Sequence, residues 1–482
     1  MEVTAREYQQ KIADHIIKKG NTLVILPTGL GKTLIGALVI EYFLKNDKKC
    51  MFLAPTRPLV DQHDKKIREY LNIEPTVITG EMHPNDRLHL YADKKIKVII
   101  ATPQTINNDL NEQPALFSGF GCIVIDECHR AVGKYAYTHV AKHAKENGLL
   151  IIGLTASPGG KADRIQQIMD SLFIDNVEIR TDTQKDVKQY IQPLDVEWVY
   201  VDLSPELKEA INLMNQLMEE KAKTLSSLNI QVTTKLSRGR LSQIYHSLIQ
   251  NKYFAALGHF SVFYNAFHGN ELLETEGPYA FDQFVERLKE RKKNVDWRIL
   301  KVQKLIQEKK LEHPKMGVLL SKLKEPELAG KKVIIFAQYR DQVNHIVKVL
   351  TENNFYAKSF LGKKEGTRNL QKETLEEFAA DKFNILVASS IGEEGIHIPA
   401  VDVAIFFEPV PSEIRSIQRR GRVGRTKEGK VIVLLAKGTR DETFRWVAAA
   451  REKTMHKIIK GIKSGKIKRK KKEQPTITDY LK

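Results

Sequence analysis

The sequence is poor in cysteine and contains no long apolar run. Its three cysteines, Cys50, Cys122 and Cys128, form neither a disulfide framework nor the ligand spacing of a zinc site. No segment approaches the roughly 20 uncharged apolar residues of a membrane-spanning helix. Charged side chains interrupt residues 1–20, where a signal peptide would have its apolar centre. We therefore expect reduced core or near-core thiols in an intracellular protein with no membrane partner.

Acidic residues are few relative to basic ones. The chain has 59 Asp and Glu against 77 Lys and Arg, a formal net charge of +18. Residues 451–482 hold twelve basic and three acidic residues and so contribute half of this excess. Such a distribution favours a polyanionic partner, above all nucleic acid. A solvated basic tail without a partner has the same composition and remains the alternative.

The 482 residues are too many for one core and suggest about three domains. Uniformly apolar runs alternate with helical spacings in two regions, as in parallel strands buried on both faces. The runs are residues 50–54, 96–101, 122–125 and 149–154, then 333–336, 385–387, 403–407 and 431–435. We predict an α/β protein with a parallel-sheet domain at 1–203, an all-helical insert at 204–325, a second parallel-sheet domain at 326–450 and a basic tail at 451–482.

The string TLVILPTGLGKT at residues 22–33 predicts a phosphate cradle between a strand and a helix. Gly29 and Gly31 allow successive backbone N–H groups to face an anion, and the following helix adds its dipole. Lys32 supplies a positive charge and Thr33 a hydroxyl for Mg²⁺. The first glycine of the general pattern is replaced by Leu26. A glycine-rich turn without nucleotide is the alternative.

Two adjacent acids follow the apolar run at 122–125. At the end of a buried strand, Asp126 is placed to bind Mg²⁺ or its water shell, and Glu127 to polarise the attacking water. A solvated acidic turn is the alternative, but the upstream cradle favours the nucleotide interpretation.

Two basic clusters lie further along the chain. Residues 418–425, QRRGRVGR, bring Gln418, Arg422 and Arg425 together, and a guanidinium that reaches a γ-phosphate would explain this density of charge. A nucleic-acid patch is the alternative there. In the helical insert, a second cluster predicts a DNA-binding surface, against the alternative of a charged helix face with no ligand. Its members are Arg291, Lys292, Lys293, Trp297 and Arg298.

Taken in order, these strings resemble the motifs of superfamily 2 helicases. The matching segments are 6–9, 26–33, 54–57, 102–104, 126–129, 155–158, 336–340, 392–399 and 418–425. The DECH string at 126–129, the helical insert and the basic tail are most similar to the archaeal Hef family, helicase-associated endonucleases for fork-structured DNA, and to Fanconi anaemia group M-type translocases. The resemblance implies two RecA-like domains with ATP and Mg²⁺ between them.

The resemblance also implies roles for individual residues. ATP would be bound by Arg6, Gln9, Leu26, Pro27, Thr28, Gly29, Leu30, Gly31, Lys32, Thr33, Gly395 and His397. Hydrolysis would be coupled to movement by His129, Thr155 and Ser157, and the DNA backbone held by Pro55, Thr56, Arg57, Thr102 and Gln104. Without the family, Gln9 is equally well a surface helix residue.

Two departures from the family pattern stand out. His397 occupies a position that is usually acidic in related enzymes, which puts ribose recognition in doubt. Hef-type proteins often carry a nuclease domain after the helicase, and nothing after Gly429 has an acidic metal site. The chain is therefore expected to be a helicase-only member or a fragment, with a nuclease domain or subunit as a partner.

The expected function is a DNA-dependent ATPase and helicase or translocase that acts on forked or branched DNA in replication-fork repair. A DECH-type sensor of double-stranded RNA is the alternative, although the cysteines supply no zinc site for the RNA-end domain usual in such sensors. At the C-terminus, Gln474, Ile477, Tyr480 and Leu481 resemble the peptide that binds the sliding clamp. Leu481 stands where that peptide usually has a second aromatic, so an unremarkable end is the alternative.

Overall fold

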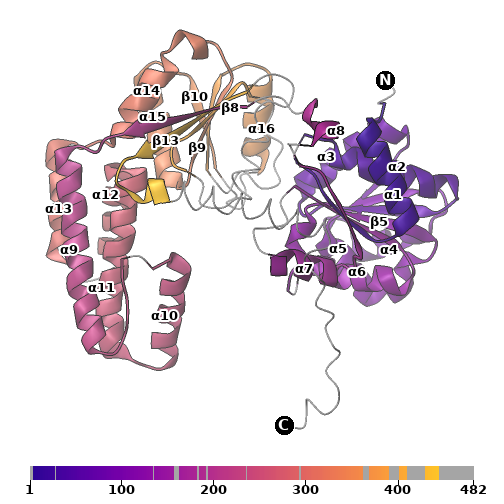
Figure 1. Cartoon of the computed structure of the whole chain (residues 1–482), viewed down its shortest axis with the longest axis horizontal. Coiled ribbons are helices and arrows are strands. Elements are labelled where there is room, and N and C mark those ends of the chain that lie inside the picture. Colours follow the sequence, from indigo (N-terminus) through magenta and orange to yellow (C-terminus); the bar gives the residue numbers. More distant parts are fainter. Residues whose placement is uncertain are drawn as a thin grey trace.

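The computed structural model describes most of the two sheet regions and the helical insert. The described residues are 4–27, 29–133, 135–156, 162–181, 184–190, 194–234, 236–291, 295–361, 368–389, 401–409 and 429–443. In Figure 1 the first sheet domain lies on the right, the second sheet at upper centre and a layer of long helices on the left. The second sheet domain thus stands between the other two parts.

The first domain is built on a seven-stranded parallel sheet of order β3-β4-β2-β5-β6-β1-β7. Its strands are β1 (Thr22–Ile25), β2 (Lys49–Leu53), β3 (Thr76–Ile78), β4 (Val98–Ala101), β5 (Phe120–Ile125), β6 (Leu150–Thr155) and β7 (Asn176–Ile179). The four apolar runs predicted here are confirmed as β2, β4, β5 and β6. Alternate side chains of these strands enter two separate apolar cores, one on each face of the sheet.

Helices cover both faces of this sheet, because each parallel crossover needs one. They are α1 (Glu7–Lys19), α2 (Lys32–Lys45), α3 (Arg57–Leu71), α4 (Pro84–Ala92), α5 (Pro103–Glu112), α6 (Ala136–Glu146), α7 (Ala162–Ser171) and α8 (Lys185–Lys188). Short 3₁₀ turns occur at Pro114–Phe117 and Cys128–Arg130. Cys50, Cys122 and Cys128 are free and buried in the cores of this domain, as predicted.

The second sheet has six parallel strands in the order β10-β11-β9-β12-β13-β8. They are β8 (Leu194–Val201), β9 (Val333–Ala337), β10 (Ala357–Phe360), β11 (Ile385–Ser389), β12 (Val403–Phe406) and β13 (Gly429–Ala436). The helices α15 (Arg340–Glu352) and α16 (Arg368–Ala379) and a 3₁₀ turn at Pro326–Leu328 belong to the same region. The four apolar runs predicted here are confirmed as β9, β11, β12 and β13. Two parallel sheets with a helical insert are therefore the fold, as predicted.

One predicted boundary is wrong. The first domain was expected to extend to residue 203, but β8 pairs with β13 from Leu194 to Val201 and so belongs to the second sheet. Because Asp195 and Glu197 alternate with apolar residues, β8 has the pattern of an edge strand and not of a buried one. The helical insert is consequently an excursion from the second domain, leaving after β8 and returning before β9.

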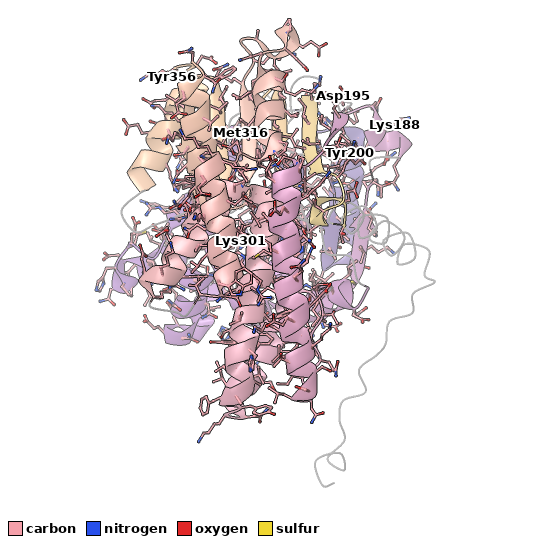
Figure 2. The ribbon with its side chains drawn as sticks, turned by 90° about the vertical axis from the view of Figure 1, so that its left-hand side faces the viewer. Lys188, Asp195, Tyr200, Lys301, Met316 and Tyr356 are labelled. Atoms are coloured by element: carbon pink, nitrogen blue, oxygen red, sulfur yellow. The ribbon has the colours of Figure 1, made fainter. Side chains whose placement is uncertain are left out.

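The insert is a layer of long helices with its own apolar core. Its helices are α9 (Pro205–Ser227), α10 (Arg238–Gln250), α11 (Phe254–Glu271), a π-helical turn at Leu272–Glu276, α12 (Pro278–Glu290) and α13 (Trp297–Lys309). The next helix, α14 (Pro314–Leu323), packs its apolar side chains into the core of the second sheet. Figure 2 looks onto the outer side of this region, with Lys301 labelled on α13 and Met316 on α14.

A buried ion pair anchors the insert to the second domain. Lys315 Nζ, on α14, lies 2.5 Å from Asp441 Oδ2, and both side chains are completely buried. The same ammonium donates to the carbonyl oxygen of Thr275 in the π-helical turn, at 3.0 Å. Since removal of either charged partner would leave the other buried and unpaired, this junction is costly to open.

Among the described residues, none of the helices is long and apolar enough to cross a membrane.

Candidate nucleotide-binding site

The phosphate cradle follows the buried strand β1. Gly29 and Gly31 adopt φ values of 84° and 75°, a conformation that glycine reaches without steric cost. A side chain at Gly31 would also collide with the Gln9 amide. Helix α2 then begins at Lys32, with no side chain capping its first turn and no acidic residue in it. Its first N–H groups therefore suit a bound anion.

Lys32 and Thr33 occupy the first two positions of α2 and are partly exposed. Lys32 Nζ donates to the carbonyl oxygens of Leu26 and Pro27, at 3.0 and 3.4 Å, so its ammonium lies over the loop that would hold the phosphates. Leu30 is buried beneath the loop. A glycine turn, a helix N-terminus, an ammonium and a hydroxyl together fit an ATP phosphate chain with Mg²⁺.

Asp126 lies at the carboxyl end of β5. In the sheet, β5 is next to β6, and β6 is next to β1, the strand that leads into the cradle. Its backbone N–H donates to Leu53 O at 2.9 Å, and its carbonyl oxygen accepts from the Tyr137 hydroxyl at 2.7 Å. The carboxylate Oδ2 lies 2.8 Å from Nε2 of His63 on α3. Burial raises the pKa of Asp126, but hydrogen bonding to His63 and the charge of Lys32 outweigh it and hold this pKa below its usual value. The carboxylate is therefore ionised, as a magnesium ligand must be.

Glu127 and His129 connect this strand end to β6. Glu127 has φ 48°, a left-handed conformation that is uncommon outside glycine and occurs at functional turns. Its Oε2 lies 3.2 Å from Nδ1 of His129, and the same nitrogen lies 3.1 Å from the Thr155 hydroxyl. The water-polarising acid predicted from the sequence is thus joined through His129 to Thr155 at the end of β6.

Helix α1 is attached to the cradle by its first turn. Gln9 is buried, which excludes the surface alternative: its Oε1 accepts from Arg6 N at 2.9 Å and its Nε2 donates to Leu30 O at 3.1 Å. The Tyr8 hydroxyl donates to the same carbonyl at 2.6 Å. The Arg6 guanidinium stacks 4.2 Å from the centre of the Tyr190 ring. Arg6 and Gln9 therefore flank the cradle, and their contact with adenine stays a prediction.

The residues predicted to hold DNA in the first domain lie at the ends of β2 and β4, which are neighbours in the sheet. Pro55 is buried and Thr56 precedes α3, where Arg57 forms an ion pair with Glu81. Thr102 caps α5 and Gln104 in its first turn is exposed. These side chains share with Asp126 the edge of the sheet where parallel strands end.

One predicted DNA-binding residue of the insert has a structural role instead. Arg298 is nearly buried, and its guanidinium donates to Asp296 Oδ1 at 2.9 Å and to Glu220 Oε2 at 2.7 Å. Because the N–H donors of Arg298 are directed at these two carboxylates, this residue holds α13 against α9 and is not available to bind a DNA phosphate. Arg291 and Trp297 are exposed, Trp297 by 62%.

Several predicted site residues lie outside the described residues. They are Thr28, Ser157, Lys292, Lys293, Gly395, His397, Gln418, Arg422 and Arg425, and the tail residues Gln474, Ile477, Tyr480 and Leu481.

His63, Tyr8, Tyr137 and Tyr190 were not predicted to contribute to the site. For His63 the sequence does contain a signal, since it shares the buried face of α3 with Val60 and Ile67 at helical spacing. A polar side chain at such a position needs a buried partner.

Two family descriptions match the chain: "Type III restriction enzyme, res subunit" over residues 2–160 and "Helicase conserved C-terminal domain" over residues 315–427. The crystal structure of the Pyrococcus furiosus Hef helicase domain matches with a TM-score of 0.71 and 37% identity, over 92% of this chain and 97% of that one. The two sheets, the cradle and the acidic strand end thus define a superfamily 2 helicase. The chain belongs to the Hef and FANCM family within that class.

Longer relatives agree with this assignment. A Methanocaldococcus jannaschii protein named as an ATP-dependent RNA helicase is 40% identical over 95% of this chain and 61% of its own length. The Neurospora crassa ATP-dependent DNA helicase mph1 is 32% identical over 91% of this chain and 41% of its own. The Arabidopsis thaliana DEAD-box ATP-dependent RNA helicase FANCM is 32% identical over 92% and 36%. The chain therefore spans less than two thirds of each of these relatives.

Proposed function

We propose that this protein is an ATP-dependent DNA helicase or translocase that remodels forked or branched DNA during replication-fork repair. The observation that carries the proposal is a path of contacts from the cradle to the acidic strand end in the first domain. The Leu26 N–H of the cradle donates to Thr155 O, and the Thr155 hydroxyl lies beside His129. His129 in turn lies beside Glu127, which follows Asp126. This path joins a nucleotide site to the sheet edge where the predicted DNA-binding residues lie. The Hef structure is named as a helicase domain and the Neurospora crassa mph1 protein as an ATP-dependent DNA helicase, which supports ATP-driven action on DNA.

In this mechanism the chain binds ATP at residues 29–33 and closes the two sheet domains around it. Magnesium would neutralise phosphate charge beside Thr33 and Asp126. Glu127 polarises the attacking water, while Gln418, Arg422 and Arg425 of the second domain approach the γ-phosphate and stabilise the charge that develops there. Hydrolysis removes the bridging phosphate, and the domains separate.

Alternating closure moves the chain along DNA because each domain holds the sugar-phosphate backbone in turn. Thr56, Arg57 and Gln104 provide such contacts in the first domain, and backbone contacts carry no sequence information. The insert adds a second surface with Arg291, Lys292, Lys293 and Trp297, which we assign to the branch point. Because the insert leaves and re-enters the second domain, it would move with that domain.

Two further partners are proposed from the sequence and the relatives. The tail residues Gln474, Ile477, Tyr480 and Leu481 would bind a sliding clamp and so raise the local concentration of the enzyme at forks. A nuclease domain or subunit would act with the helicase, as the resemblance to Hef-type helicase-associated endonucleases implies. Both proposals place the protein with DNA, at the nucleoid or in a nucleus.

Steady-state ATP hydrolysis in the presence of different nucleic acids tests the proposal. Forked DNA and a four-way junction should stimulate hydrolysis more than linear duplex DNA or double-stranded RNA at the same salt concentration. The RNA arm is needed because two of the relatives carry RNA-helicase names. Strongest stimulation by double-stranded RNA would replace the DNA proposal with RNA binding or sensing.

A further inference from the structure

His63 is a buried histidine that lies outside the segments that resemble helicase motifs. It lies on α3, only 3% exposed, with its ring packed 4.4 Å from the ring centre of Phe52 on β2. Its Nε2 is 2.8 Å from Asp126 Oδ2, although the two residues are 63 positions apart in the sequence. The imidazole is thus held on one side by the sheet and on the other by the acid at the end of β5.

The direction of this hydrogen bond follows from the two groups. A carboxylate that serves as a metal ligand is ionised, so the oxygens of Asp126 can only accept. Nε2 of His63 must therefore carry the proton and donate it. The other ring nitrogen, Nδ1, is buried and has no hydrogen-bond partner within the described residues.

We propose that His63 is a positioning residue for the magnesium ligand Asp126. A carboxylate rotates readily about its last torsion angle, and the Nε2–H donor removes this freedom by fixing Oδ2. Packing against Phe52 in turn fixes the imidazole. The carboxylate is then pre-oriented before Mg²⁺ and nucleotide arrive, so that less ordering is needed on binding. This proposal rests on the proposed nucleotide site and adds a residue to it.

Binding of a fluorescent ADP analogue, titrated with Mg²⁺ and without turnover, measures this role. His63→Leu removes the donor and keeps an apolar side chain of similar size. Half-saturation should then require about 10–100 times more Mg²⁺, the usual effect of losing an outer-shell partner. Nucleotide affinity in the absence of Mg²⁺ should stay unchanged. His63→Gln retains an N–H donor and should recover most of the wild-type Mg²⁺ dependence.

Val60→Ala is the matched control, because Val60 is fully buried on the same face of α3 one turn earlier. It disturbs packing but not the hydrogen bond, so its Mg²⁺ dependence should equal that of the wild type. A wild-type Mg²⁺ dependence in His63→Leu, or the same shift in Val60→Ala, would overturn the proposal. If the leucine variant fails to fold, His63→Met replaces it and the comparison with His63→Gln decides.

Asp126→Asn separates failure of this inference from failure of the site. If this variant requires more Mg²⁺ while His63→Leu does not, Asp126 is the ligand and only the positioning role is refuted. If wild type and Asp126→Asn depend equally on Mg²⁺, the metal role of Asp126 is wrong, and the positioning role is refuted with it.

Discussion

At the scale of single residues, the proposed site assigns ground-state binding and the chemical step to different side chains. Lys32 lies over the phosphate loop, whereas Glu127 stands at the strand end beside His129. Lys32 would meet the phosphates as soon as ATP binds. Glu127 would act on the water that attacks them. The two side chains should therefore affect different kinetic constants.

Substitution of each residue should reveal this division. Lys32→Ala should weaken ATP binding, because it removes the positive charge from the cradle. Glu127→Gln should bind ATP normally and lower its turnover by about 10²–10⁴-fold, the usual contribution of general base catalysis. Equilibrium binding together with single-turnover hydrolysis checks both expectations. Near-normal turnover in Glu127→Gln would remove it from the mechanism.

The His129–Thr155 hydrogen bond makes a separate prediction. Thr155→Val removes the hydroxyl with little change of volume, so the nucleotide site should remain intact. DNA-stimulated hydrolysis should change little, while base pairs separated per ATP should fall about tenfold, since the lost bond is worth ~1–1.5 kcal/mol. Parallel hydrolysis and strand-displacement assays measure the ratio. An equal fall in both rates would assign Thr155 to catalysis and not to coupling.

At the scale of elements, the insert divides its arginines between structure and surface. Arg298 links α13 to α9 through Glu220, and Arg287 on α12 lies 2.6 Å from Asp341 on α15. Arg287 and Arg291 are both exposed, but no ion pair within the described residues involves Arg291, at the end of α12. Basic residues that are close in the sequence therefore have different structural roles.

This division is testable with two variants. Arg298→Ala should destabilise the insert by about 1–3 kcal/mol, because it leaves the partly buried Asp296 without its partner. It should alter DNA affinity only through that loss of stability. Replacing Arg291, Lys292 and Lys293 by glutamine should leave the melting temperature unchanged and reduce the salt dependence of DNA binding, by a slope of about one per lost phosphate contact. Identical salt slopes in the triple variant and the wild type would leave this cluster without a role in DNA binding.

His268 predicts a pH dependence of the junction between the insert and the second domain. Burial lowers the pKa of His268 to about 4, assisted by Arg238, Arg287 and Arg440, compared with about 6.5 for an unfolded histidine. The folded state thus prefers the neutral ring. The stability that this preference gives is complete above pH 6.5 and is lost as the pH falls toward 4, by at most about 1.4 kcal/mol per pH unit.

Melting temperatures measured at several pH values test this expectation. Between pH 6.5 and 4.5 the wild type should lose more stability than His268→Gln, because glutamine can accept the Arg238 hydrogen bond and does not titrate. If the melting temperatures of the two proteins fall equally between pH 6.5 and 4.5, His268 does not control the junction.

At the scale of the whole molecule, the sequence predicts some features much better than others. Strands such as β5 and β9 were predicted because they are uniformly apolar. The edge strands β7 and β8 were not, since Glu178 and Glu197 interrupt them. The partner of β8 lies more than 200 residues away on β13, and only the folded chain reveals that pairing.

The same limit applies to the site. The cradle and the acidic pair are local strings, so the sequence predicts them directly. The contacts of His63 with Asp126 and of Arg298 with Glu220 connect distant segments and depend on how the helices pack. A polar residue on an apolar helix face predicts that a buried partner exists, but it does not predict which one.

The most direct test of ATP-driven remodelling of branched DNA is strand displacement on a synthetic replication fork. Wild-type protein with ATP and Mg²⁺ should convert the fork to its displaced products much faster than it opens a linear duplex of equal length. Lys32→Ala should show no ATP-dependent conversion under the same conditions. Conversion that does not require ATP, or equal rates on forked and linear DNA, would contradict the proposed function.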